Sequence, residues 1–246
     1  MKTMLMAFLI GALAPVAHAA GPSINVGPIY DYLDGDKSTY LKRIYNGGES
    51  TAFVKVTILE MHYKADGTHE ETTVAPMDGS GDREGLIASP ARLIIPAQGM
   101  QSIRLIFRGE REQERYFRVR FVPVIPTKDD AFAVEETERE AYQRSLSAGV
   151  QVMTGYGTAF FVRPATTVFA TRLDDSLTDY RITNAGNSTI VLDELKSCSA
   201  ASPHECEPAK KSHIRPGGSF TLEKVQGRIH RFELIEGSAK KTIEVK

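Results

Sequence analysis

Two cysteines and two histidines near the C-terminus are the residues whose types could together hold a metal ion. Cys198, His204, Cys206 and His213 offer two sulfurs and two ring nitrogens, a donor set that suits zinc. The Cys-x7-Cys spacing, however, does not match that of common zinc-finger knuckles. A lone close pair of cysteines in an exported chain is most simply a disulfide. The sequence therefore predicts a Cys198–Cys206 disulfide, with no metal site and no cofactor.

Residues that could carry catalysis do not form a known motif. The chain contains no Gly-x-Ser-x-Gly elbow, no His-Glu-x-x-His pair and no glycine-rich phosphate loop. The carboxylate pairs Asp174/Asp175 and Glu70/Glu71 lie in polar, turn-like contexts that favour solvated charge. These observations predict a protein that is not an enzyme.

Arg104, Arg118, Arg120 and Arg163 lie within or at the end of expected strands. Three roles are open to them. They could be solvated charges on a sheet face, or they could anchor an anionic group, because arginine offers a bidentate fork to a carboxylate. They could also form an internal salt-bridge network that fixes two domains.

The N-terminus, MKTMLMAFLIGALAPVAHAA, has a short basic start, an apolar run and the small-residue ending Ala17-His18-Ala19. This pattern predicts a secretory signal peptide over residues 1–19, cleaved after Ala19 or Ala20. No second run of about eighteen apolar residues follows, which predicts no membrane insertion. The 30 basic residues nearly balance the 31 acidic ones, so the composition shows no electrostatic footprint for nucleic acid.

Strand patterns dominate the rest of the first half. They cover residues 40–44, 51–61, 91–95, 100–107 and 115–124. The last pattern alternates strictly and places Arg118 and Arg120 on one face, with Phe117, Val119 and Phe121 on the other.

An acidic segment over 128–145 separates these strands from a long apolar one. Its pair Glu135/Arg139 could support a helical turn, but with no apolar stripe to bury a mobile loop is favoured. A strand is then expected over 146–163, with alternating apolar residues at its start. Such a strand at an exposed sheet edge is normally an aggregation hazard.

The segment Arg163-Pro164-Ala165 predicts a domain boundary, because proline ends the strand before a new run of strand patterns. The later patterns cover residues 167–173, 180–184, 189–196, 219–225, 230–235 and 241–245. Short strands separated by turns every 8–12 residues indicate β-sandwiches, here two in tandem. The predicted fold class is all-β.

Several of these segments together resemble a known family. They are GLIASPARLIIPAQGMQSIRLIF (85–107), ERYFRVRFVPV (114–124), the acidic segment, the strand ending FFVRP (160–164) and the smaller cysteine-containing domain. The set resembles the periplasmic pilus chaperones of the chaperone–usher pathway, in the alternate branch that serves colonisation-factor fimbriae and common pili. The resemblance covers nearly the whole mature chain and is strongest over 85–124 and 146–164.

The resemblance implies two immunoglobulin-like domains in a boomerang arrangement. Residues 20–164 would form the N-terminal, subunit-binding domain, and residues 165–246 the smaller C-terminal one. Such a chaperone acts in the periplasm, where it binds, folds and caps pilin subunits and delivers them to an outer-membrane usher. Its edge strand completes the incomplete fold of the subunit by donor-strand β-augmentation. The matching positions are Leu146, Ala148, Val150, Val152 and Thr154.

Two further groups of residues carry over from the family. Arg104, Glu114 and Arg163 match an Arg–Glu–Arg ion network that orients the two domains. The better-known branch also uses an arginine and a lysine to hold the carboxylate at the C-terminal end of the pilin. Here the lysine position is Ala159, and no arginine lies near residues 27–30. Candidate replacements are Lys42, Arg43 and Arg118, because a buried carboxylate needs a nearby cation.

The alternative interpretation is a structural or adhesive β-sandwich protein of a pilus, a pilin-like protein. A pilin, however, should show an N-terminal donor extension and one incomplete domain. A free chaperone with an exposed donor strand is also open to self-association.

Overall fold

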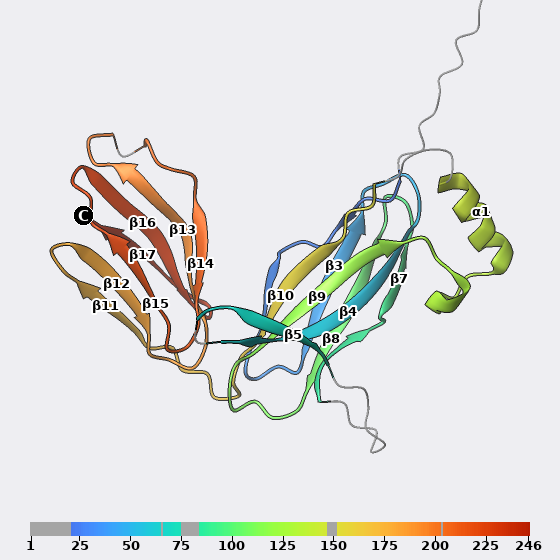
Figure 1. Cartoon of the computed structure of the whole chain (residues 1–246), viewed down its shortest axis with the longest axis horizontal. Helices are drawn as coiled ribbons and strands as arrows, with labels where there is room; N and C mark the ends of the chain where they lie inside the picture. The colour runs from blue at the N-terminus through green and yellow to red at the C-terminus, as the bar shows by residue number, and fades with distance from the viewer. Residues whose placement is uncertain (1–20, 65, 75–83, 147–151, 203) are drawn as a thin grey trace, which may run out of the picture.

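The computed structural model describes residues 21–64, 66–74, 84–146, 152–202 and 204–246. Figure 1 shows two β-sandwiches that meet at an angle, in a boomerang shape. Each has its own hydrophobic core. The buried residues of the first core range in sequence from Ile24 to Val162, and those of the second from Tyr180 to Val245. The predicted all-β fold of two tandem sandwiches is confirmed. The expected boundary at Pro164 falls between these cores, and the predicted signal peptide lies outside the described residues.

The first sandwich consists of two sheets. The smaller sheet has the strand order β1 (Ile24–Asn25), β3 (Thr39–Asn46), β8 (Met100–Arg108), β6 (Gly85–Ser89). The larger sheet has the order β2 (Tyr30–Leu33), β10 (Tyr156–Val162), β9 (Arg115–Val124), β4 (Ala52–Tyr63), β5 (His69–Thr73), and β7 (Arg92–Ile95) also pairs with β4. One face of the larger sheet packs on the core and the other faces the second sandwich, so we call it the cleft sheet.

The alternation along β9 determines which side chains enter the core. Phe117, Val119 and Phe121 are fully buried between the two sheets, whereas Arg118 and Arg120 lie on the cleft face. Burying such aromatic and branched side chains is the main contribution to the stability of a sandwich. The predicted faces of this strand are confirmed.

The acidic segment after β9 is helical, so the expected mobile loop is wrong. It forms the short 3₁₀ helix η1 (Lys128–Asp130) and the helix α1 (Glu136–Leu146) at the far end of the first sandwich (Figure 1). The aromatic rings of Phe132 and Tyr142 pack edge-on against Phe53 of β4, with centroids 5.4 and 4.7 Å away. These aromatic contacts bury one side of the segment. The sequence does not reveal this burial, because no continuous apolar stripe runs along the helix.

The second sandwich is smaller. Its sheets have the orders β11 (Thr171–Asp175), β12 (Asp179–Asn184), β15 (Ser219–Glu223), and β14 (Lys210–Ile214), β13 (Ile190–Ser199), β16 (Arg228–Glu236), β17 (Ala239–Val245). A disulfide joins Cys198 of β13 to Cys206, as predicted, so the two sulfurs of the zinc alternative are bonded to each other. Within the described ranges, no helix is both long and apolar enough to cross a membrane.

Removing the disulfide should destabilise the second sandwich. The bond closes a loop with a sequence separation of 8. Restricting so short a loop in the unfolded chain contributes about 2–3 kcal/mol to stability. The variant Cys198→Ala/Cys206→Ala should therefore unfold at lower urea concentration, and the reduced wild-type protein should match it. An unchanged unfolding midpoint would show that the bond contributes nothing to this domain.

Candidate functional site

The start of β10 is an open edge of the cleft sheet. Val152 is 83% exposed, and residues 152–155 have no regular structure before β10 begins at Tyr156. On one side β10 pairs with β9 along its whole length. On the other side β2 pairs with it only from Ala159 onward. In the described chain, Tyr156 to Thr158 therefore have a strand neighbour on one side only.

Of the five expected donor residues, the three that the structure describes lie in two different environments. Leu146 is not in a strand: it is the last residue of α1 and is only 6% exposed. Ala148 and Val150 lie outside the described residues. Val152 and Thr154 are exposed, without regular structure. Among the described residues of the strand expected over 146–163, only Tyr156–Val162 form a strand, and Leu146 instead ends the helix α1.

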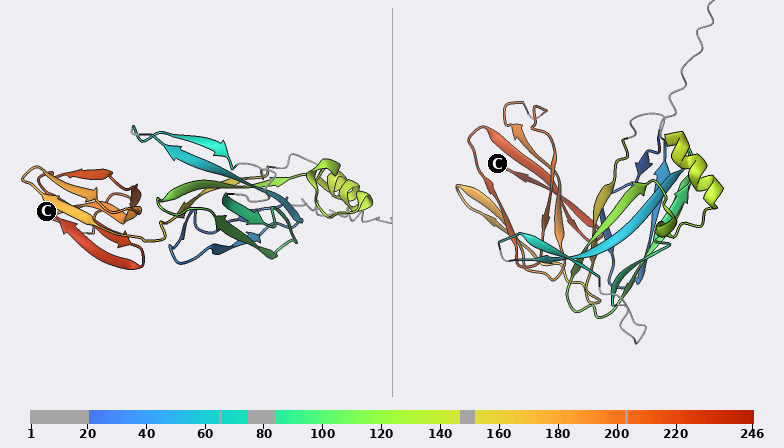
Figure 2. Two further views of the ribbon diagram at one scale, coloured as in Figure 1. Left: turned by 90° about the horizontal axis from the view of Figure 1, so that it is seen from below. Right: turned by 45° about the vertical axis from the view of Figure 1, so that its right-hand side comes forward.

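The cleft face of the larger sheet carries an apolar cluster. Met61, Ala159 and Phe161 are buried there, and Tyr32 and Tyr116 pack at its margin. Figure 2 shows β4 and β5 extending as a ribbon from the first sandwich toward the second. The small Ala159 occupies the position where a lysine was expected, and the aromatic neighbours supply no replacement for its charge.

His213 reaches from β14 of the second sandwich onto this cluster. Its ring centroid lies 4.1 Å from that of Tyr30 and 5.5 Å from that of Phe161, on which it stacks. Burial lowers the pKa of His213 to about 4, and the charge of Lys211 acts in the same direction while Asp193 opposes it. The ring is therefore a neutral aromatic contact between the domains at neutral pH.

Acidification should weaken the folded state through His213. The pKa of His213 is about 4 in the folded protein and about 6.5 in the unfolded chain. As the pH falls from about 6.5 to about 4, the unfolded chain therefore binds the proton first. Stability is thus fully present above about pH 6.5 and declines toward pH 4; partial exposure of the ring limits the loss to about 1–2 kcal/mol. Urea unfolding at about pH 7.5 and about pH 5 measures the loss, and His213→Phe should show a smaller one. Equal losses in both proteins would assign the effect to other groups.

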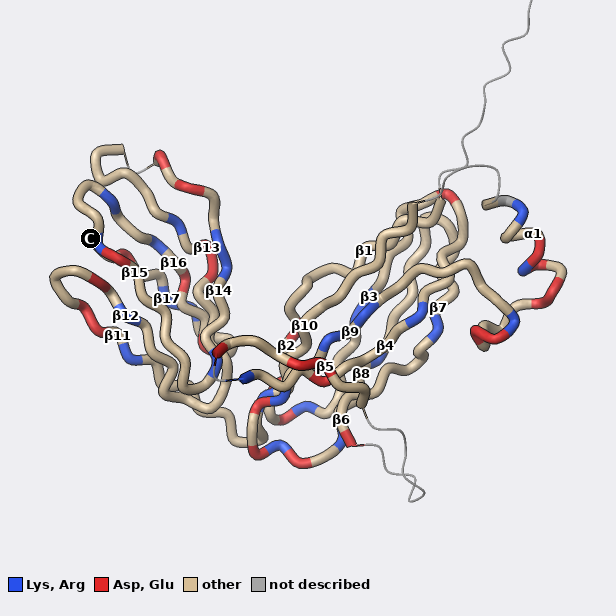
Figure 3. The backbone as a smooth tube through the Cα atoms, in the orientation of Figure 1, with Lys and Arg blue, Asp and Glu red and all other residues tan. Residues whose placement is uncertain are grey.

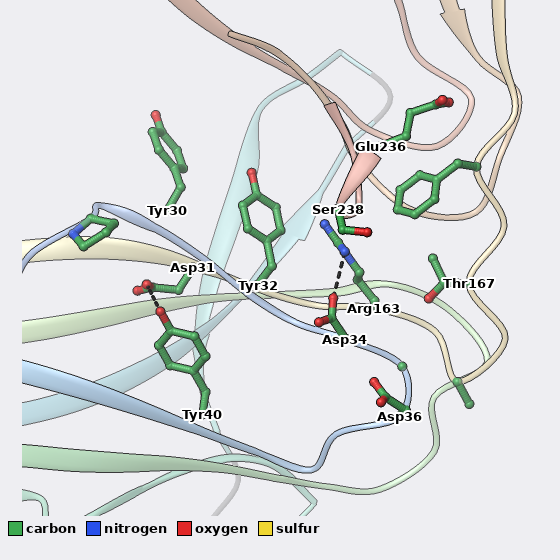
Figure 4. A pocket seen from close by; sticks show the side chains of 15 residues that line it. Tyr30, Asp31, Tyr32, Asp34, Asp36, Tyr40, Arg163, Thr167, Glu236 and Ser238 are labelled. Carbon is green, nitrogen blue, oxygen red and sulfur yellow. Dashed lines mark hydrogen bonds and ion pairs between the residues drawn. The ribbon is translucent and has the colours of Figure 1, made fainter. Parts of the chain in front are cut away.

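A cavity of about 730 Å³ opens beside these aromatic residues, where β2 meets the second sandwich. Figure 4 shows Arg163 and Asp34 joined in its wall, with Tyr30 and Tyr32 nearby. Asp31 of β2, which also lines the cavity, is paired with Lys42. Arg163, Asp34 and Asp31 thus already have partners within the chain.

Arg163 forms an ion pair within the first domain, and its flat guanidinium contacts both domains. The Nη1 atom donates a hydrogen bond to Asp34 Oδ1 at 2.8 Å. The guanidinium lies over the ring of Tyr32 in the first domain and over that of Phe169 beyond β10, at 4.9 and 5.3 Å. Arg163 thus lies at the junction, but its ion-pair partner, Asp34, is not a member of the Arg–Glu–Arg network expected from the sequence.

Glu114 also crosses between the domains, again with partners of its own. Its buried carboxylate accepts hydrogen bonds from Ser188 Oγ at 2.7 Å and from the backbone nitrogen of Thr189. Arg104 does not connect the domains. It is exposed on β8, where it lies opposite Leu41 of β3. Among the described residues, no ion pair connects Arg104 with Glu114 or Arg163. The single three-residue network expected from the motif is therefore not present.

The three cations considered as carboxylate anchors have different surroundings. Lys42 is 3% exposed, and its Nζ donates to Asp31 Oδ2 at 2.7 Å and to the carbonyl oxygen of Pro28 at 2.8 Å. Arg43 is exposed on the smaller sheet, facing away from the cleft. Arg118 lies on the cleft face, where its Nε donates to Glu71 Oε1 at 3.1 Å. Of the three, Arg118 is the one placed to meet a partner in the cleft.

Fimbrial chaperones are similar to this chain over nearly its whole sequence, although no family model matches it. It is 24% identical over 245 residues to a "Probable fimbrial chaperone EcpB" of Escherichia coli O157:H7, covering 99% of this chain and 98% of the relative. The EcpB protein of Escherichia coli strain SMS-3-5 is 24% identical over 243 residues, covering 98% and 97%.

Solved structures show the same fold. The class 5 fimbriae chaperone CfaA superposes with a TM-score of 0.56 at 20% identity, covering 91% of this chain and 98% of that one. A chain of the CsuC–CsuE chaperone–tip adhesion complex of Acinetobacter baumannii superposes with a TM-score of 0.51 at 14% identity, covering 92% and 98%. The chain is thus a sequence relative of the fimbrial chaperones over nearly its whole length and has the two-domain all-β fold of chaperone–usher chaperones.

Proposed function

We propose that this protein is a non-enzymatic periplasmic chaperone that binds pilin subunits, caps them and delivers them to an outer-membrane usher. The open edge of β10 carries the proposal: β2 leaves Tyr156–Thr158 unpaired on one side, and Val152 projects into solvent just before them. A pilin sheet that lacks its last strand can add to this edge through main-chain hydrogen bonds.

The donor segment runs from Leu146 to Thr154 and continues into β10. Alternate side chains of this segment fill pockets of the pilin groove, while Gly155 to Arg163 keep the strand attached to its own domain. Because Leu146 is buried at the end of α1, the last turn of this helix unwinds when the segment engages a pilin along its full length. Unwinding this turn requires little free energy, because single turns at the end of a short helix are only weakly stable.

Periplasmic co-expression tests the proposal. A tagged copy of this chain, expressed with the pilin subunits encoded beside it, should recover a pilin in a soluble complex from the periplasm. A pilin-like role predicts a different result, because pilins recover one another as polymers. The two separate cores of the described chain also differ from the one incomplete domain of a pilin. A folded chaperone that recovers no pilin would contradict the proposal.

A further inference from the structure

The chain between β1 and β2 passes from one sheet of the first sandwich to the other. Asn25 of β1 pairs with β3 of the smaller sheet, whereas β2 pairs with β10 of the cleft sheet from Tyr30 onward. The chain turns at Gly27, whose φ of 68° is a left-handed conformation that glycine adopts readily. The backbone nitrogen of Gly27 donates a hydrogen bond to Asn25 Oδ1 at 2.8 Å, which closes the turn. In the described part of the chain, this change of sheet leaves the start of β10 open on one side.

A longer β2 in the same register would close that edge. It would place Ile29 opposite Thr158, because Tyr30 lies opposite Ala159 in the parallel pair. Thr158 is fully buried and faces the interior of the sandwich, so Ile29 would face the interior as well. Instead, Ile29 is 52% exposed. Burial of this apolar side chain favours the closed edge, so another interaction holds the chain away from it.

Lys42 of β3 supplies that interaction from inside the sandwich. Its Nζ donates hydrogen bonds to the carbonyl oxygen of Pro28 at 2.8 Å and to Asp31 Oδ2 at 2.7 Å. Figure 3 marks the basic positions of β3, of which Lys42 points into the sandwich whereas Arg43 is exposed. Figure 4 shows the hydroxyl of Tyr40 joined to Asp31, at its other carboxylate oxygen. Lys42 thus ties the smaller sheet to the first residues of β2 and to the turn before them.

The buried ion pair selects one register of β2. Replacing both members of such a pair by apolar residues often leaves stability unchanged, so its benefit is specificity. A shift of β2 by two residues, which keeps the same faces, would separate Asp31 from Lys42 and leave both charges buried and unpaired. Pro28 strengthens the selection, because it has no backbone N–H to donate and its carbonyl oxygen is bonded to Lys42. These residues therefore fix the point at which β2 begins to pair with β10.

We propose that the buried Lys42–Asp31 pair keeps the edge of β10 open for the incoming polypeptide by holding residues 27–29 away from it. Lys42 is then a positioning residue, which acts through β2 and does not contact the captured chain. Without the pair, residues 27–29 extend β2 along β10, Ile29 becomes buried, and the chaperone covers its own binding edge. The inference rests on the proposed function, because it assigns to this edge the capture of a polypeptide.

Hydrogen exchange of the Gly157 amide in the free protein tests the inference without a pilin. The backbone nitrogen of Ala159 donates to the carbonyl oxygen of Ile29, and backbone groups alternate along a strand, so the N–H of Gly157 points to the same, open side. The variant Lys42→Met/Asp31→Val replaces the pair by apolar residues of comparable size. Its Gly157 amide should exchange at least about tenfold more slowly than that of the wild type, because the extended β2 covers it.

Two further variants make this measurement specific. Tyr40→Phe removes only the hydroxyl contact with Asp31, so Gly157 should exchange as in the wild type. Ile29→Ser in the double variant removes the apolar side chain whose burial drives closure, and it should restore fast exchange. Thermal unfolding verifies that each variant is folded, and Lys42→Met/Asp31→Asn serves the same test if the apolar pair does not fold. Wild-type exchange at Gly157 in a folded variant without the pair would overturn the inference.

Capture of a pilin separates failure of this inference from failure of the proposed function. Wild-type and double-variant chains carrying different tags are expressed with the same pilin, and the double variant should recover about tenfold less of it. Slower exchange of Gly157 with full recovery of pilin would support the role of the pair but contradict capture at this edge. Reduced recovery with unchanged exchange would assign the loss to another cause and overturn the inference.

Discussion

The variant Val152→Asp should lose nearly all of its bound pilin while folding as the wild type does. In the proposed complex Val152 enters an apolar pocket of the pilin, where an aspartate would bury an unpaired carboxylate. The affinity should fall by at least about a hundredfold. In the free protein the side chain is 83% exposed, so the free energy of unfolding should change by less than about 0.5 kcal/mol. Pull-down from the periplasm and urea unfolding measure the two effects.

A matched substitution distinguishes loss of the donor residue from a general effect of charge. Leu177 is 98% exposed in the turn between β11 and β12, on the second sandwich. Leu177→Asp introduces the same charge at an equally exposed apolar position, and it should recover as much pilin as the wild type. Equal losses in the two variants would show that the effect does not depend on the edge of β10.

The variant Lys42→Met should be the most destabilising substitution among the charged residues discussed. It removes the cation beside the buried carboxylate of Asp31, which is 2% exposed and also accepts a hydrogen bond from the hydroxyl of Tyr40 at 2.7 Å. Removing one partner of a buried ion pair typically lowers stability by about 3–5 kcal/mol. Burial and the hydrogen bond to Asp31 already raise the pKa of Tyr40, so its hydroxyl stays a neutral donor that cannot supply the missing charge.

Two companion variants test whether the loss of stability comes from leaving a buried charge unpaired. Lys42→Met/Asp31→Asn removes both charges and should recover much of the lost stability, because no unpaired ion stays buried. Lys37→Met breaks the exposed pair of Lys37 with Asp34 and should change stability by less than about 1 kcal/mol. A loss for Lys42→Met as small as that for Lys37→Met, in urea unfolding, would show that the pair is not buried in solution.

Strands with one face in the core can be predicted well from sequence. Along β9 the alternation of Phe117, Val119 and Phe121 with arginines is strict, because the core excludes charge from one face and water favours it on the other. The polar strand β5 escapes prediction for the same reason: its side chains are mostly exposed, so HEETT shows no apolar alternation and resembles a turn. Its two β-branched threonines are the available signal.

Segments whose structure depends on distant contacts could not be predicted. The helix α1 is held by Phe53, a residue of β4 far away in sequence, so its local composition favours a loop. Arg104 matches the expected motif, but strand register places it on the outer face opposite Leu41. The position of Glu71 beside Arg118 likewise depends on how β5 pairs with β4. Motifs identify residue types, whereas pairing determines which of them meet.

Hydrogen exchange of the backbone amides of residues 152–158 tests the central claim most directly. The wild-type chaperone is compared free and in its purified complex with a pilin. Donor-strand pairing adds main-chain hydrogen bonds along the open edge, so the alternate amides that point away from β9 should exchange at least about tenfold more slowly in the complex. Unchanged exchange throughout 152–158 in an intact complex would show that the pilin binds elsewhere and would contradict donor-strand capture at this edge.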